Sequence, residues 1–252
     1  MYPRPQLKRE SFFLLNGQWD FAFDDENIGV LEGWSHTVRG DRKINVPFTY
    51  ETGKSGIGDE TPHGVIWYWK NITITNEFKK DQSIQINFEG CDYHLDLWVN
   101  GVYKGSHDGA YTRFAFELGK FAEGEEVLLS IRVEDPHSEE QVRGKQRWLS
   151  DNYGCWYVQT TGIWKDVWLE QVSDDYVEKI KITPDIYKKT VTIHTMCHSN
   201  KENLIMKSDV YFEGKFINSV SGKLEAGVCQ MDIDVYNKYV GEWGIELWSP
   251  DA

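Results

Sequence analysis

The sequence has few cysteines and no long apolar run. Its four cysteines, Cys91, Cys155, Cys197 and Cys229, form no CxxC pair and no regular framework. This pattern favours reduced thiols, although two long-range disulfides are conceivable. The only apolar run near the N-terminus, residues 12–15, is too short for a secretory signal or a membrane span. We therefore expect a cytoplasmic protein that does not associate with a membrane.

Positive charge is also scarce. Lysine and arginine together number 27 against 40 aspartates and glutamates, which gives a formal net charge of -13. Nucleic acids and anionic membrane surfaces need a basic face on their protein partners. Both are therefore excluded as expected partners, and neutral ligands are the natural ones.

The short motifs of common catalytic and metal sites are missing. The sequence contains no GxSxG, no P-loop and no metal-ligand spacing, and His94, His107 and His137 have no second histidine at i+2 or i+4. Acidic runs such as residues 123–126 lie in loop-like segments, where solvated charge is the simplest interpretation. The sequence thus predicts no catalytic group, no metal and no cofactor within the chain.

Aromatic residues, in contrast, are concentrated in one stretch. Residues 148–170, WLSDNYGCWYVQTTGIWKDVWLE, hold four tryptophans and two tyrosines. Such rings offer a flat, partly polar surface, and a sugar ring is a flat object that stacks on it. The second half alternates apolar and polar residues from Ile163 to Glu170, which predicts a strand. We expect an aromatic loop that is attached to a rigid strand.

The remaining sequence indicates short strands joined by turns. Residues 63–75 alternate strictly, and Asn100-Gly101 is the typical sequence of a two-residue hairpin turn. No helical periodicity extends through the first 170 residues, with only a hint of a helical turn at residues 118–122. We predict an all-β jelly roll over residues 1–172.

A second, smaller β-sandwich of immunoglobulin type is predicted over residues 173–252. Aromatics become sparser after Val172, and strand-like segments recur. The expected strands of this domain are residues 176–183, 190–197, 205–212, 228–235 and 244–248.

Five blocks of sequence resemble a known family. LNGQWDF, VPFTYE, VIWYWKNI, the segment of residues 88–118 and TTGIWKDVWLE follow one another in the order found in glycoside hydrolase family 2. That family includes β-galactosidases, β-glucuronidases and β-mannosidases. The resemblance covers essentially the whole chain, as a sugar-binding jelly roll followed by an immunoglobulin-like sandwich.

The resemblance implies that the catalytic part of the enzyme lies elsewhere. In the family a TIM barrel follows these two domains and carries the two catalytic glutamates of a retaining mechanism. The chain is therefore expected to be a fragment whose second sandwich is incomplete at its C-terminus, with a carbohydrate substrate and the missing barrel as its partners. On its own it should be inactive.

The resemblance also directs attention to one loop. In related galactosidases and glucuronidases an aspartate six residues before the glycine of the TTGIW block touches the sugar, and here that position is Trp156. Recognition by that carboxylate cannot be carried over, and Asp151 could replace it only if the loop were reshaped. Stacking by Trp156 and Tyr157 is the expected alternative, with packing against the core or the barrel as the other possibility.

Three further residues are candidates for contact with sugar. His63 precedes the VIWYWK strand in a loop where some relatives place a sugar-contacting side chain. His107 and Tyr111 lie in the loop-like segment SHDGAYTRF after the predicted hairpin. Each of the three could equally be a surface or core residue.

Two other functions remain open at this point. The chain could be a free-standing carbohydrate-binding protein that uses the jelly roll as a lectin. Alternatively, both domains could be structural, supporting the barrel and building the interface of a homo-oligomer.

Overall fold

The computed structural model describes residues 2–136, 140–237, 244–245, 247–248 and 250, which form two compact units. The larger unit comprises Met1–Pro3 and Arg9–Val172, and the smaller comprises Arg4–Lys8 and Ser173–Ala252. In the part of the chain that the structure describes, no helix is long and apolar enough to cross a membrane. Two short 3₁₀ helices, η1 (Pro5–Leu7) and η2 (Gly53–Ser55), accompany the strands.

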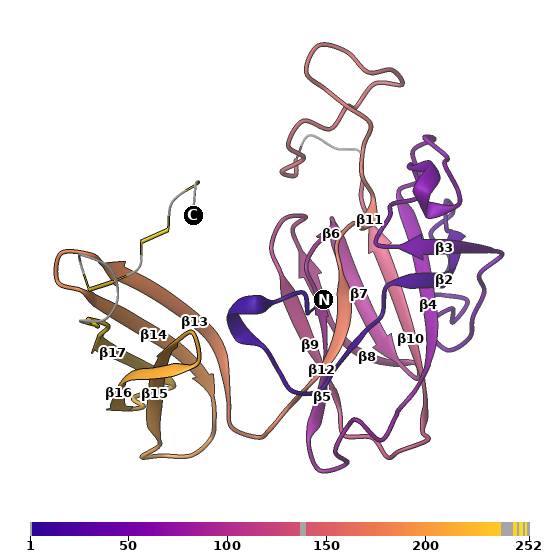
Figure 1. The fold of residues 1–252 in the computed structure, drawn as a ribbon. Helices are drawn as coiled ribbons and strands as arrows, with labels where there is room; N and C mark the ends of the chain where they lie inside the picture. The colour runs from indigo at the N-terminus through magenta and orange to yellow at the C-terminus, as the bar shows by residue number, and fades with distance from the viewer. Residues whose placement is uncertain (1, 137–139, 238–243, 246, 249, 251–252) are drawn as a thin grey trace. The chain divides into compact units, whose positions relative to one another are not determined.

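The larger unit is a jelly-roll sandwich of two antiparallel sheets (Figure 1). A six-stranded sheet has the order β3 (Arg42–Val46), β2 (Gly17–Phe23), β4 (Val65–Thr73), β10 (Glu126–Glu134), β7 (His94–Val99) and β8 (Val102–Asp108). A four-stranded sheet has the order β1 (Phe12–Leu14), β12 (Val167–Val172), β5 (Ser83–Phe88) and β9 (Phe114–Gly119). A small pair, β6 (Cys91–Asp92) with β11 (Gly162–Ile163), completes the unit.

Alternating side chains build the core of the larger unit. Leu95, Leu97 and Val99 of β7 are buried, while the residues between them are only partly so. This period of two places every second residue on the inner face of the sheet. A two-residue turn sets the register of β7 with β8. Asn100 and Gly101 form this turn, and both have positive φ, as predicted.

The outer face of the six-stranded sheet carries a second, smaller apolar cluster. Trp67 and Trp69 of β4 stack with ring centroids 5.8 Å apart and are fully buried. Their indole nitrogens donate to Asp24 Oδ2 at 2.9 Å and to the Trp34 carbonyl at 2.8 Å. The long polar segment after β2 therefore covers this face, and both faces of β4 are buried.

The strand expected from Ile163 to Glu170 is interrupted. Ile163 belongs to β11 and pairs with β6, whereas β12 begins at Val167 and pairs with β5 and β1. Between them the Trp164 indole nitrogen donates to the Ala110 carbonyl at 2.9 Å. The expected helical turn at 118–122 is also wrong, because residues 118 and 119 are the end of β9.

The smaller unit is a β-sandwich of a three-stranded and a two-stranded antiparallel sheet. The first has the order β13 (Tyr176–Asp185), β14 (Thr190–His198) and β17 (Val228–Asp234), and the second pairs β15 (Ile205–Phe212) with β16 (Lys215–Lys223). The strand expected at 244–248 is not formed by its described residues, and position 246 lies outside the described part of the chain.

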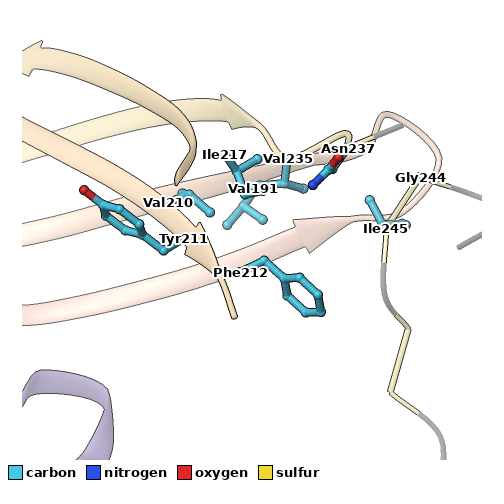
Figure 2. Close-up of a pocket in the computed structure, with 9 residues that line it drawn as sticks. All are labelled: Val191, Val210, Tyr211, Phe212, Ile217, Val235, Asn237, Gly244 and Ile245. Atoms are coloured by element: carbon cyan, nitrogen blue, oxygen red, sulfur yellow. The ribbon is translucent and has the colours of Figure 1, made fainter. Parts of the chain in front are cut away.

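A pocket of about 230 Å³ opens in this smaller sandwich (Figure 2). Its lining is mainly aliphatic and aromatic, from Val191, Val210, Phe212, Ile217 and Val235 among others. Few polar groups converge on it, whereas sites for polar ligands place several such groups at the ligand. The pocket therefore lacks the features of a sugar site.

Candidate functional site

A long loop connects β10 to β11 at one end of the jelly roll. We call its residues 140–161 the rim loop; Figure 1 shows it extending beyond the sheets above β11. Its two arms are joined where the Arg147 backbone nitrogen donates to the Tyr157 carbonyl at 2.6 Å and the Tyr157 nitrogen donates to the Lys145 carbonyl at 2.8 Å. A loop with internal pairing of this kind can hold side chains in fixed positions.

The tip of the rim loop is an aromatic cluster. The rings of Trp148 and Trp156 meet edge to face at 4.8 Å between centroids, and Tyr153 lies edge to face with Trp148 at 5.5 Å. Trp148 is 45% exposed and Tyr157 is 61% exposed, while Trp156 is half-buried. The tip thus combines packed rings with open aromatic surface, which suits stacking against a flat ligand.

Asp151 lies at the same tip. Its side chain is exposed, and Oδ2 accepts a hydrogen bond from the Ser150 hydroxyl at 3.1 Å. The structure therefore brings Asp151, Trp156 and Tyr157 onto one loop, as the sequence order requires.

Arg147 fixes the rim loop to the neighbouring loop before β4. Its buried guanidinium donates to Glu60 Oε2 at 2.8 Å, to Asn152 Oδ1 at 3.0 Å and to Gln159 Oε1 at 3.3 Å. The Gln159 amide in turn donates to the Glu60 carbonyl at 2.8 Å. Because one side chain bridges both arms and a second loop, it restrains the base of the aromatic tip.

His63 lies in that neighbouring loop but is largely packed away. Its ring stacks on Phe23 with centroids 3.6 Å apart, and Nδ1 lies 2.8 Å from Asp25 Oδ1. Its Nε2 lies 3.5 Å from Asp59 Oδ2. With the ring held on one face by Phe23 and at Nδ1 by Asp25, only a small part of His63 is open to a ligand.

Tyr111 and His107 differ in their surroundings. Tyr111 is half exposed, and its hydroxyl lies close to the rim loop, since a Cβ added to Gly144 would come within 2.8 Å of that oxygen. The His107 ring stacks on Phe114 at 3.8 Å, and Nε2 lies 3.1 Å from Thr112 Oγ1. Burial lowers the pKa of His107, so this residue is a neutral, packed side chain at neutral pH.

Three buried carboxyl groups lie beneath the rim loop. We call Glu51, Asp92 and Asp135 the acidic junction; they come from the segment after β3, from β6 and from the residue after β10. Their exposed fractions are 6%, 2% and 1%. Desolvation raises the pKa of both Glu51 and Asp92 to about 7, and the charge of Asp135 adds to both shifts.

Among the residues that the structure describes, no group of three or more histidine, cysteine, aspartate or glutamate side chains could hold a metal ion.

The comparison with family models decides the family. The model described as "Glycosyl hydrolases family 2, sugar binding domain" matches residues 12–173. The chain belongs to glycosyl hydrolase family 2.

Its curated relatives within the family are β-glucuronidases and β-galactosidases. A putative β-glucuronidase of Formosa agariphila is 28% identical over 165 residues, covering 62% of this chain and 19% of the relative. A β-galactosidase of Thermoanaerobacterium thermosulfurigenes is 27% identical over 83% of this chain and 28% of its own length. A β-glucuronidase of Paenibacillus borealis is 24% identical over 92% of this chain and 41% of its own length. The family 2 chain thus spans well under half the length of these relatives.

A solved structure shares the fold. The crystal structure of a Ruminococcus gnavus β-glucuronidase aligns with 93% of this chain and 40% of its own, with a TM-score of 0.69 and 16% sequence identity. The chain therefore shares the all-β fold of a jelly roll followed by a smaller β-sandwich with that structure.

Sequence reasoning missed the buried polar residues of this site. Residues 136–147 are charged and lack large apolar groups, a composition that fits either a solvated linker or a role at the rim of a site, and Arg143, Gln146 and Arg147 are buried. Glu51 and Asp92 carried no local signal at all. The one available signal was position, since the charged segment directly precedes the aromatic cluster.

Proposed function

We propose that this chain is the non-catalytic N-terminal part of a retaining β-glycosidase of the β-galactosidase or β-glucuronidase type. In this proposal a TIM barrel elsewhere in the enzyme carries the two catalytic glutamates, and the rim loop helps to shape its substrate pocket. The observation that carries the proposal is an aromatic tip, partly exposed and internally braced, on the family's sugar-binding domain. The limited share of each relative that the chain covers also supports it.

Within this proposal, Trp148, Trp156 and Tyr157 contact the carbohydrate or its aglycone by stacking. Tyr111 lies beside the rim loop and extends the same surface. His63 and His107 act by packing the neighbouring loops, because their rings are already engaged by Phe23 and Phe114. Asp151 is the exposed carboxylate nearest the tip in sequence and is available to accept hydrogen bonds from sugar hydroxyls.

The test is made on the enzyme encoded by the complete gene. We expect Trp156→Ala and Tyr157→Ala to lower kcat/KM for a β-galactoside or β-glucuronide by about 10-fold, equivalent to one aromatic contact of ~1 kcal/mol or more. Tyr187→Ala, at an exposed tyrosine of the smaller unit, is the matched control and should leave the rate unchanged. A gene that ends directly after Ala252 would overturn the proposal.

The isolated chain provides a second test. Retaining hydrolysis needs two carboxyl groups about 5 Å apart beside the scissile bond. We expect the 252-residue chain to release no aryl leaving group from aryl β-galactosides or β-glucuronides. Hydrolysis by this chain would contradict a purely supporting role.

A free-standing carbohydrate-binding protein is the second candidate, and the open rings of Trp148 and Tyr157 favour it. It predicts a change in tryptophan fluorescence when oligosaccharides are titrated into the isolated chain, and loss of that change in Trp148→Ala. If no glycan in a broad panel alters the fluorescence while the complete enzyme depends on Trp156, the supporting role is favoured.

A further inference from the structure

The acidic junction ties together the two ends of the rim loop. Asp135, just before the loop, accepts hydrogen bonds from the Gln141 amide and, at 3.1 Å, from the hydroxyl of Thr161 at the far end. Its backbone nitrogen donates to the Gly64 carbonyl at 3.0 Å. Its carboxylate therefore connects the first arm of the loop to the last residue of the loop, and its backbone connects both to the segment before β4.

Asp92 makes a second connection of the same kind. Its Oδ2 accepts from the Gln146 amide at 2.7 Å, and the Gln146 side-chain oxygen accepts from the Thr160 backbone nitrogen at 2.8 Å. The chain from Asp92 through Gln146 to Thr160 again joins one arm of the loop to the other.

Glu51 is the exception within the junction. Both of its carboxylate oxygens are buried, and neither has a hydrogen-bond partner in the described part of the chain. Thr161 lies beside it, but the single hydroxyl proton of Thr161 is given to Asp135. A buried carboxylate that lacks well-formed hydrogen bonds is costly in free energy when it is ionised, because its charge has lost its water. A protonated carboxyl at the same position avoids most of this cost.

The charges around Glu51 do not compensate it. Titratable and charged groups that act on Glu51, Asp92 or their buried neighbours come from the same segment, from β4, from β6, from the residue after β10 and from the rim loop; they include Tyr50, Tyr68, Cys91, Asp135 and Arg143. Burial raises the pKa of Tyr50, Tyr68 and Cys91, so these groups stay neutral. Arg143 is the cation of the set, and it acts on Asp92.

We propose that the acidic junction is a proton-controlled clasp that positions the rim loop. With Glu51 protonated, negative charge in the junction is confined to Asp92 and Asp135. These two carboxylates accept the hydrogen bonds from Gln141, Gln146 and Thr161 that hold the loop. Loss of the proton places a further negative charge near Asp135, where the nearby donors of Thr49, Thr161 and the Glu51 backbone only partly offset it and form no complete hydrogen bond with either carboxylate oxygen. The charge is relieved when the loop lifts and admits water, and the aromatic tip then loses its fixed position.

Hydrogen–deuterium exchange of the 252-residue chain tests this clasp directly. Exchange of peptides within residues 141–160 is measured at pH 6.0, 7.0 and 8.5 and corrected for the intrinsic dependence of exchange on pH. In the wild type we expect protection of these peptides to fall roughly tenfold or more across this range, as a group that titrates near neutrality requires. Peptides from β13 and β14 in the smaller unit report on general loosening and should change little.

Two variants make the result specific. Glu51→Gln keeps the shape of the side chain but cannot ionise, so the loop should stay protected at pH 8.5. Glu77→Gln, at an exposed glutamate of the same unit, is the matched control and should behave as the wild type does. Gln146→Ala breaks the link to Asp92 and should give a poorly protected loop at every pH.

Equal pH dependence of loop protection in the wild type and in Glu51→Gln would overturn the clasp. If Glu51→Gln does not fold, a wild-type loop whose corrected protection is constant from pH 6.0 to 8.5 overturns it instead. The measurement contains no carbohydrate, so its outcome is independent of whether the proposed function is correct.

Discussion

At Glu51, burial and neighbouring charge act in the same direction. Both favour the protonated carboxyl, and they raise its pKa from the ordinary 4.5 to about 7. The folded state therefore holds a proton that the unfolded chain releases above pH 4.5. It follows that the free energy of unfolding decreases as the pH rises from about 4.5 to about 7 and stays low above that range.

Glu51→Gln should remove this penalty. At pH 8 we expect the variant to be more stable than the wild type by about 1–3 kcal/mol, because an amide has no charge to desolvate. At pH 4 the advantage should vanish, since both states of the wild type are then protonated. Urea unfolding at the two pH values measures the difference, and an advantage of equal size at both would contradict the assignment.

Gly162 is a second residue whose environment restricts the choice of side chain. Its φ is +90°, and a Cβ would lie 2.1 Å from the Tyr68 hydroxyl oxygen. Gly162→Ala should therefore cost more than ~2 kcal/mol of stability through clash and backbone strain. Gly53→Ala, where no atom lies within 4 Å of the added Cβ, is the control, and thermal unfolding of both variants separates the two cases.

At the scale of elements, the aromatic stretch of residues 148–170 divides into two parts with different roles. Trp168 in β12 is fully buried, and its indole nitrogen donates to Glu170 Oε2 at 3.0 Å, whereas Trp148 on the rim loop is 45% exposed. The exposed aromatic surface of this stretch therefore lies on the loop, at Trp148, whereas Trp168 on the strand belongs to the core.

Substitution of these two tryptophans should lower the stability by very different amounts. Trp168→Ala should destabilise the larger unit by about 3–5 kcal/mol, because it leaves a large cavity in a packed sheet. Trp148→Ala should cost less than ~1 kcal/mol, since much of its surface is already in water. Chemical denaturation followed by far-UV circular dichroism gives both values, and similar losses would contradict the division.

Arg147 connects elements that are far apart in the sequence. Without its guanidinium, the rim loop loses its bonds to Glu60 and Gln159. Arg147→Ala should therefore increase proteolytic cleavage within residues 141–159 several-fold. Arg113→Ala, at a more exposed arginine that lies 3.7 Å from Glu89, is the matched control and should leave the cleavage rate unchanged.

Strands and turns could be predicted from the sequence because their signals are local. The alternation of β7 and the Asn100-Gly101 turn depend on neighbours within a few residues, and the structure confirms both. The break between Ile163 and Val167 could not be predicted, since it follows from pairing with two distant partners, β6 and β5. The acidic junction could not be predicted for the same reason, because residues 51, 92 and 135 come together only when the sheets have formed.

At the scale of the whole molecule, the two units differ in how much core they bury. The larger unit has an extensive cluster that includes Trp19, Phe21, Tyr68 and Phe88, among many others. Among the described residues of the smaller unit, the buried hydrophobic ones are Ile193, Cys229, Met231 and Ile233. A small core of this kind supplies little hydrophobic stabilisation.

Thermal unfolding should therefore occur in two steps. We expect the smaller unit to unfold first, and the larger unit to unfold at a temperature at least ~10 °C higher. Differential scanning calorimetry would show two transitions, and Trp168→Ala should lower only the second. A single transition that moves as a whole in this variant would show that the units unfold cooperatively.

The paired arms at the base of the rim loop have a consequence for evolution. Arg147 and Tyr157 close the loop from within, and Asp135 and Thr161 close it again at the sheet. Insertions or substitutions at the tip therefore add only a small entropic cost of loop closure, and they leave the sheets undisturbed. A lineage can then change the surface that such a tip presents, by substitutions at a few exposed positions, while the fold beneath it stays the same.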